Sequence, residues 1–227
     1  MSVIKHKNGP DYLSETTFED INTHVDDEEN VIRVVKSTGD TMTGQLLLSG
    51  AGIAWDDLRT PVQSLKLSGT KPPSWVTYKG TELLAFSDQS VLGNEEHIFF
   101  AMQVPHNYKI GTNLHMHVHY VPEDNTGGNV YWALTYSWAS IEEAFPGELT
   151  IRVASPCGTT TDAHKMSEFP EISGLGKGIS SMIICKLQRN SSDALDTYNG
   201  KSVYLLEIDA HYEIDSFGSA AETTKVA

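Results

Sequence analysis

Apolar and polar side chains alternate with a period of two along residues 113–121 and again along residues 129–138. Successive side chains of a strand point to opposite sides, so both stretches are predicted to be strands with one buried face. The polar segment between them, residues 122–128, ends in two glycines and predicts a hairpin that joins the two strands. The apolar faces consist of Leu114, Met116, Val118 and Tyr120 in the first stretch, and of Val130, Trp132, Leu134, Tyr136 and Trp138 in the second.

Similar signals recur along the chain and predict an all-β fold. Segments rich in β-branched and aromatic residues, bounded by Gly, Pro, Asn or Asp, are expected to form strands. Besides the two above, they lie at residues 62–67, 75–78, 83–86, 96–104, 148–154, 180–188 and 202–215. Helical signals are weak. This succession of strands and turns predicts a jelly-roll-like antiparallel β-sandwich, preceded by an extended N-terminal arm.

Residues 1–36 are polar and acidic, with a like-charge run at residues 26–29. A segment of this composition buries little apolar surface and is expected to serve as an anchoring arm. Residues 37–61 are interpreted as a turn-rich linker, and residues 62–227 as the sandwich domain. The short apolar segments of the arm and linker are where inter-chain or anchoring contacts are expected, namely at Val31, Ile32, Val34, Val35, Met42, Leu46, Leu47 and Leu48.

The charge balance argues against a partner that is a nucleic acid. The formal net charge is −14, and no Lys/Arg-rich run is present to neutralise phosphates. No run of about 18 apolar residues predicts a membrane span, and the first residues lack the apolar core of a signal peptide, which predicts synthesis and retention in a cytoplasm. Cys157 and Cys185 have no metal-ligand or redox spacing and are expected to be reduced, partly buried thiols.

Three histidines, His115, His117 and His119, lie on the polar face of the stretch 113–121. In the stretch 202–215, one face is expected to carry Glu207, Asp209 and His211, and the other to carry Tyr204, Leu206, Ile208, Ala210 and Tyr212. If the two polar faces met, they would offer enough ligands for a divalent metal. The weak candidates for metal ligands are His115, His117, His119 and His211.

Three interpretations of this histidine face stay open at this point. It could be a hydrogen-bonded polar sheet face, a set of imidazoles that share an ion on a trimer axis, or the site of a metal-dependent, cupin-like enzyme. The enzyme would use His115, His117, Glu207 and His211. The sequence contains no Walker loop, dinucleotide fingerprint, nucleophile elbow or His-Glu-x-x-His helix, so no catalytic residue and no cofactor is assigned.

Residues 38–50 read TGDTMTGQLLLSG. This stretch resembles the GDTMTG-x-L segment that recurs in tail-fibre and related fibre proteins of tailed bacteriophages. A second stretch, with Leu114 before the three alternating histidines and a Trp-x-Leu-x-Tyr-x-Trp strand at residues 132–138, is similar to a region common in phage structural proteins. That second resemblance covers roughly residues 60–215. It implies a virion-associated β-sandwich and carries no enzymatic residues.

The two resemblances predict a virion structural protein and not an enzyme. The expected molecule is a capsid decoration or head-fibre protein, made in the host cytoplasm, whose arm docks on the major capsid protein or another virion protein and whose homotrimeric sandwich projects outward. One alternative is a tail fibre or receptor-binding protein in which loops at 122–128 and 156–162 contact host-surface glycans. The metal-dependent enzyme is the other alternative.

Overall fold

The computed structural model describes residues 5–6, 24–25, 31–32 and 47–225, and the chain divides into two units, Met1–Gly44 and Gln45–Ala227. In the first unit, three two-residue strands form an antiparallel sheet in the order β1-β2-β3. They are β1 (Lys5–His6), β2 (His24–Val25) and β3 (Val31–Ile32). Of the expected anchor residues, Val31 and Ile32 therefore form β3, and Val34, Val35, Met42 and Leu46 lie outside the described residues.

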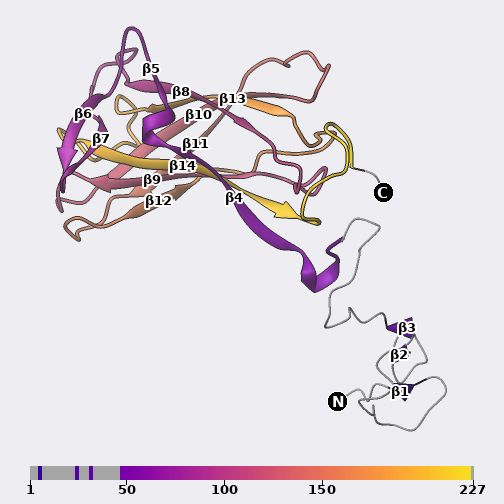
Figure 1. Ribbon diagram of the computed structural model, residues 1–227. Helices are drawn as coiled ribbons and strands as arrows, with labels where there is room; N and C mark the ends of the chain where they lie inside the picture. Colours follow the sequence, from indigo (N-terminus) through magenta and orange to yellow (C-terminus); the bar gives the residue numbers. More distant parts are fainter. Residues whose placement is uncertain (1–4, 7–23, 26–30, 33–46, 226–227) are drawn as a thin grey trace. The chain divides into compact units, whose positions relative to one another are not determined.

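The second unit is a sandwich of two antiparallel sheets, which confirms the predicted fold class (Figure 1). The five-stranded sheet has the order β11-β10-β13-β8-β5, and the six-stranded sheet has the order β12-β9-β14-β7-β6, with β4 paired to β14. The strands are β4 (Ala54–Pro61), β5 (Lys66–Leu67), β6 (Ser74–Tyr78), β7 (Thr81–Phe86), β8 (His97–Gln103), β9 (His115–Pro122), β10 (Asn129–Ala139), β11 (Leu149–Pro156), β12 (Lys165–Glu168), β13 (Met182–Arg189) and β14 (Val203–Ile214).

The hydrophobic core lies between the two sheets and is built from the alternating apolar faces. Trp132 of β10 is fully buried, and its ring centroid lies 5.3 Å from that of Phe86 and 5.9 Å from that of Tyr120. Burying one such side chain contributes about 1.5–3 kcal/mol. Every member of the two predicted apolar faces is buried except Tyr136, which is partly exposed. Cys157 and Cys185 are both free and buried.

The predicted hairpin between residues 113–121 and 129–138 is wrong. β9 belongs to the six-stranded sheet and β10 to the five-stranded sheet, so the loop between them crosses from one layer to the other. The physical reason is that both strands bury a bulky apolar face, and the two faces meet across the core. Gly128 allows the crossing because its φ is +103°, a region that favours glycine, and because a Cβ there would lie 2.6 Å from the carbonyl oxygen of Thr197.

The sandwich begins before residue 62, where the sequence placed its boundary. Residues 54–61, expected in the linker, form β4 and pair with β14 from Glu207↔Pro61 to Ile214↔Ala54. Most β4 side chains are exposed, so no apolar alternation marked this edge strand. Just before it, the Leu48 N–H donates to the Asp215 carbonyl at 2.6 Å, and the Leu47 side chain is exposed. The inter-chain role of these two leucines stays a prediction.

Two short 3-10 helices, η2 (Gly50–Gly52) and η3 (Val62–Ser64), flank β4, so that the strand expected at residues 62–67 is reduced to β5. β12 (Lys165–Glu168) was not predicted, because four residues at a sheet edge carry little alternation of apolar and polar side chains.

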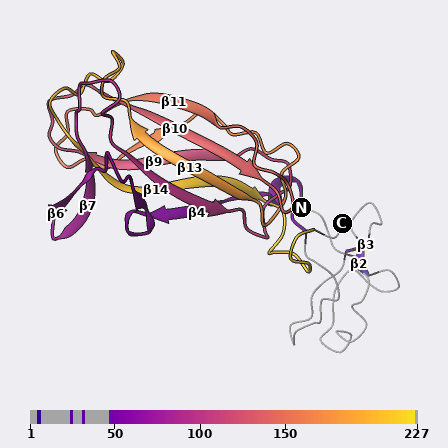
Figure 2. The same cartoon turned by 90° about the horizontal axis from the view of Figure 1, so that it is seen from above.

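β6 and β7 lie together at one end of the sandwich (Figures 1 and 2). Across the residues with described coordinates, no helix has the length and apolar character needed to cross a bilayer.

Candidate functional site

The outer face of the five-stranded sheet carries a row of exposed apolar and polar side chains. On β8, residues 98, 100 and 102 are buried in the core, so that His97, Phe99 and Ala101 point outward. On β13, Ile184 and Lys186 lie on the same outer side, between the buried positions 183, 185 and 187. Phe99 is 41% exposed and Ile184 is 45% exposed. Phe99 and Ile184 are thus two large apolar side chains that stay exposed on one sheet face.

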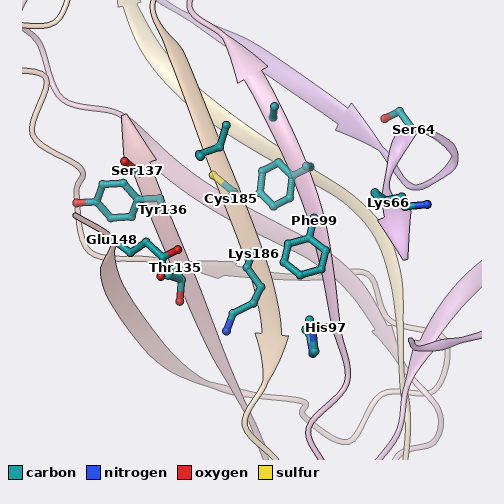
Figure 3. A pocket seen from close by; sticks show the side chains of 13 residues that line it. Ser64, Lys66, His97, Phe99, Thr135, Tyr136, Ser137, Glu148, Cys185 and Lys186 are labelled. Carbon is teal, nitrogen blue, oxygen red and sulfur yellow. The ribbon is translucent and has the colours of Figure 1, made fainter. Parts of the chain in front are cut away.

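Two adjoining hollows follow this face and share Thr135 and Lys186, so they form one groove across the strands β8, β13, β10 and β11. We call it the sheet groove. The hollows have volumes of about 740 Å³ and about 710 Å³. Figure 3 shows the Phe99 ring and the Lys186 side chain on neighbouring strands, with Thr135 and Glu148 farther along the same hollow. The groove is large enough for a ligand of several sugar units or a short peptide.

Hydrogen-bonding groups line the sheet groove between its apolar patches. The Thr135 and Thr150 hydroxyls lie 2.9 Å apart on neighbouring strands, and Gln188 donates to Asn190 Oδ1 at 2.6 Å. Among the described residues, the cations Lys66, Arg152 and Lys186 line the groove and form no ion pair. Three carboxylates, Glu95, Glu148 and Asp193, also line the groove, so its formal charges balance and the cations offer donors without making the face net positive.

The carboxylate of Glu95 lies at the far end of the groove and is held in its charged form. Burial by itself raises the pKa of this carboxyl, but the hydrogen bond from the Ser192 hydroxyl and backbone N–H groups outweigh burial and lower the pKa overall. A carboxylate with a lowered pKa accepts hydrogen bonds and is poorly suited to act as a general acid near neutral pH. Glu95 is therefore not a candidate general acid.

The predicted histidine face exists, and it lies on the outer side of the six-stranded sheet. β9 pairs with β14, which brings the two expected polar faces side by side, with His117 opposite Asp209 and His115 opposite His211. Asp209 is 3% exposed and His117 is 4% exposed. The Asp209 carboxylate contacts His119 Nε2 at 3.1 Å through Oδ1 and His211 Nε2 at 3.1 Å through Oδ2.

A β-bulge changes the assignment of faces in β14. The register between β9 and β14 shifts between Leu205 and Glu207, so the extra residue Leu206 reverses the alternation. Before the bulge Val203 and Leu205 are buried, and Tyr204, expected on the same face as Ile208, is partly exposed, with its ring centroid 5.7 Å from that of Tyr78. The sequence could not locate this bulge, since no glycine or proline marks it.

The four residues assigned to the hypothetical enzyme do not come together as one ligand set. Glu207 is engaged by Arg59 of β4, whose Nε and Nη2 donate to its two oxygens at 2.5 Å and 2.6 Å. His115 packs against Trp55 in an edge contact with ring centroids 4.9 Å apart. His117 and His211 are close, with ring centroids 4.2 Å apart, and the third group beside them is Asp209.

His119 lies at the rim of the same cluster. Its Nδ1 is 2.8 Å from His164 Nε2, in addition to the contact of Nε2 with Asp209. The hydrogen bond with Asp209 raises the pKa of His119, and burial opposes that rise only in part. Burial raises the pKa of Asp209, but the neighbouring imidazoles of His117 and His119 lower it by more, so that Asp209 is charged near neutral pH.

Sequence reasoning missed the sheet groove, because it is assembled from strands that are distant along the chain. A partial signal was available in residues 97–101, where the alternation leaves Phe99 on the face opposite the apolar one. The loops at residues 122–128 and 156–162, expected to contact glycans, contribute no residue to either hollow of the groove. Their role in binding stays a prediction.

No protein-family profile matches this chain, and a comparison with curated proteins finds no match. Among solved structures, an isomalto-dextranase of Arthrobacter globiformis in complex with panose aligns at 16% identity and a TM-score of 0.42, over 68% of this chain and 23% of the enzyme. A xylan-binding domain from Paenibacillus barcinonensis aligns at 12% identity and a TM-score of 0.36, over 68% of this chain and 93% of the domain. A mannan-recognising carbohydrate-binding module aligns at 11% identity and a TM-score of 0.36, over 70% and 98%. Scores of this size do not indicate what this chain binds.

Proposed function

We propose that this chain is a non-catalytic structural protein of a tailed-phage particle whose β-sandwich binds a glycan of the host surface in the sheet groove. The observation that carries the binding role is the groove itself. It combines the exposed Phe99 and Ile184 with hydroxyl, amide, cationic and carboxylate side chains on one continuous face. Sugars present apolar C–H faces and hydroxyl edges, and a lining of this mixed kind matches both.

The virion context is supported by the sequence. The GDTMTG segment at residues 39–44 resembles phage fibre segments, and it lies between the acidic arm and the sandwich. In this proposal residues 1–36 dock on the major capsid protein or another virion protein. The chains form a homotrimer, and three weak glycan sites then act together through avidity.

A glycan-binding role favours an exposed fibre over a purely structural capsid decoration. A decoration protein needs only an anchor and a stable outer domain, and nothing in that role requires a groove with exposed apolar and charged side chains on the outer sheet face. Glu95 is not proposed as a catalytic acid, because Ser192 and backbone donors hold this groove carboxylate ionised. The usual mechanism of glycoside hydrolysis uses one carboxyl group that is protonated near neutral pH.

The binding role is tested with the full chain on an array of bacterial surface polysaccharides, followed by affinity measurements on the best ligand. Truncation of a central aromatic contact in an interface costs about 1.4 kcal/mol or more, so Phe99→Ala is expected to weaken binding at least about tenfold. Trp75→Ala is the matched control, because Trp75 is an aromatic of similar exposure, 46%, on β6 of the other sheet. Equal losses in both variants, or no glycan bound at all, would contradict the proposed role.

The cations of the groove give a second readout. If Lys186 and Arg152 contact negative groups on the glycan, raising the salt concentration from about 0.05 M to about 0.5 M weakens binding, because exposed charge pairs are screened. Binding that is insensitive to salt would exclude an acidic sugar.

The virion context is tested separately by imaging phage particles in which the chain is labelled at its C-terminus. Finding the label on neither the head nor the tail of the particle would contradict the virion context.

A further inference from the structure

A second set of polar side chains lies on the other sheet, away from the sheet groove. His117, Asp209 and His211 each offer one nitrogen or carboxylate oxygen, and these atoms lie within 4.8 Å of one another. They come from the two neighbouring strands β9 and β14, whose pairing fixes His117 opposite Asp209. Residues with this spacing are held by the backbone ladder of the sheet and not by a loop.

One nitrogen of the set is buried without a hydrogen-bond partner. His117 Nδ1 has no hydrogen-bond partner among the described residues, and because the side chain is only 5% exposed, bulk water does not replace one. Its nearest acceptor, Asp209 Oδ1, is 3.7 Å away, which is longer than a hydrogen bond. A buried nitrogen left in this way costs free energy unless something else binds it. The nitrogen faces the carboxylate of Asp209, so the missing partner belongs between the two groups.

We propose that His117, Asp209 and His211 bind one divalent cation of the zinc class on the outer face of the six-stranded sheet. Imidazole nitrogens with one carboxylate oxygen are a donor set that suits zinc and its transition-metal neighbours, whereas calcium and magnesium prefer oxygen ligands alone. The site lies outside the sheet groove and does not depend on glycan binding.

The geometry needs only a small closure of side chains around the ion. Ligands about 2.0–2.1 Å from a tetrahedral zinc ion lie about 3.4 Å from one another. The present spread of up to 4.8 Å therefore closes by at most about 1.4 Å, a distance that rotation of the imidazoles and the carboxylate covers. The backbone of β9 and β14 can remain in place.

The neighbours of the three ligands are suited to a supporting role. His119 Nε2 donates to Asp209 Oδ1 at 3.1 Å, and Asp57 Oδ1 lies 2.9 Å from His211 Nε2. Groups of this kind orient metal ligands and tune their basicity. The side chain of His211 is 36% exposed and that of Asp57 is 51% exposed, so the cation reaches the site from this side and keeps water there.

The test uses the full chain, stripped with a chelator, dialysed and titrated with zinc chloride by calorimetry at neutral pH. We expect saturation at one ion per chain. Loss of a supporting residue typically weakens a metal site 10–100-fold, so loss of a ligand in His211→Gln or Asp209→Asn is expected to weaken binding about 100-fold or more. His115→Gln is the matched control, because His115 lies on the same face of β9 and outside the three-residue set.

A second measurement avoids substitution of buried residues and needs no mutant to fold. In spectra of the ¹⁵N-labelled histidine rings of the native chain, zinc is expected to shift the resonances of His117 and His211 together at one equivalent, and to leave His97 and His106 unchanged. Binding that does not saturate, shifts spread over the exposed histidines, or a His211→Gln variant that binds as tightly as the native chain would each overturn the proposal.

Discussion

Arg189, at the end of β13, is the fully buried cation whose removal should most damage the sandwich. Its guanidinium uses all five N–H donors. Nε and Nη2 donate to the two oxygens of Asp196 at 2.8 Å each, and the remaining donors reach the carbonyls of Phe86 at 3.0 Å, Lys201 at 2.6 Å and Tyr198 at 2.8 Å. The side chains of Arg189 and Asp196 are 0% and 1% exposed. This one residue thus joins β13, β7 and the segment that leads into β14.

Substitution Arg189→Leu is expected to lower the free energy of unfolding by about 6–8 kcal/mol. Removing one partner of a buried ion pair costs about 3–5 kcal/mol, because the other charge stays buried and unpaired. The three carbonyls that lose their donors add about 1 kcal/mol each where water cannot reach them. A loss of this size is a large part of the about 5–15 kcal/mol that stabilises an ordinary domain.

The assay is urea unfolding followed by the fluorescence of tryptophan, to which the fully buried Trp132 contributes. Arg152→Leu is the matched control, since Arg152 is an exposed arginine on the neighbouring part of the same sheet, and its loss should change stability by less than about 0.5 kcal/mol. The double variant Arg189→Leu with Asp196→Leu should be more stable than Arg189→Leu alone, because it no longer contains the buried, unpaired Asp196 carboxylate. A loss below about 1.5 kcal/mol, or no recovery in the double variant, would refute the reasoning.

Two further predictions concern the loop between β9 and β10. Gly128→Ala places a Cβ 2.6 Å from the carbonyl oxygen of Thr197 at a φ of +103°, so it should destabilise the chain by about 2 kcal/mol or more in thermal and urea unfolding. The control Gly147→Ala meets nothing within 4 Å, and equal effects of the two would contradict this account of the loop. The hydrogen bond with Lys201 lowers the pKa of Asp124, so its stabilisation is present above the unfolded-state value of about 3.9 and is lost as pH falls through the folded pKa. Asp124→Asn should therefore be less stable than the native chain at neutral pH, with a gap that narrows from about pH 5 toward about pH 2, and a gap that widens on acidification would be the opposite of what we expect.

Much of the fold could be predicted from the sequence, because strands with one buried face carry a readable pattern. The stretches 96–104, 129–138 and 180–188 match β8, β10 and β13 to within two residues at each end. The pairing of strands was harder to predict. Residues 113–121 and 129–138 show the same alternation whether they lie side by side or face each other across a core, and the crossing loop at Gly128 was taken for a hairpin turn.

More of the histidine cluster than of the sheet groove could be predicted from the sequence. The alternation put His115, His117 and His119 on one face, and the same reasoning put Asp209 and His211 on one face of the last strand. What joined the two faces was the pairing of β9 with β14, which no local signal specifies. The sheet groove depends entirely on strand pairing, since the strand order β11-β10-β13-β8-β5 brings together lining residues that lie between positions 64 and 193 of the chain.

The most direct test of the proposed function is a map of backbone amide shifts as the best-binding surface glycan is titrated into the full chain. The account predicts that the largest shifts occur on β8, β10 and β13, around Phe99, Thr135 and Lys186, and that the outer face of β9 and β14 changes little. Shifts centred on the histidine cluster, on the loop at residues 122–128, or spread evenly over the sandwich would contradict binding in the sheet groove.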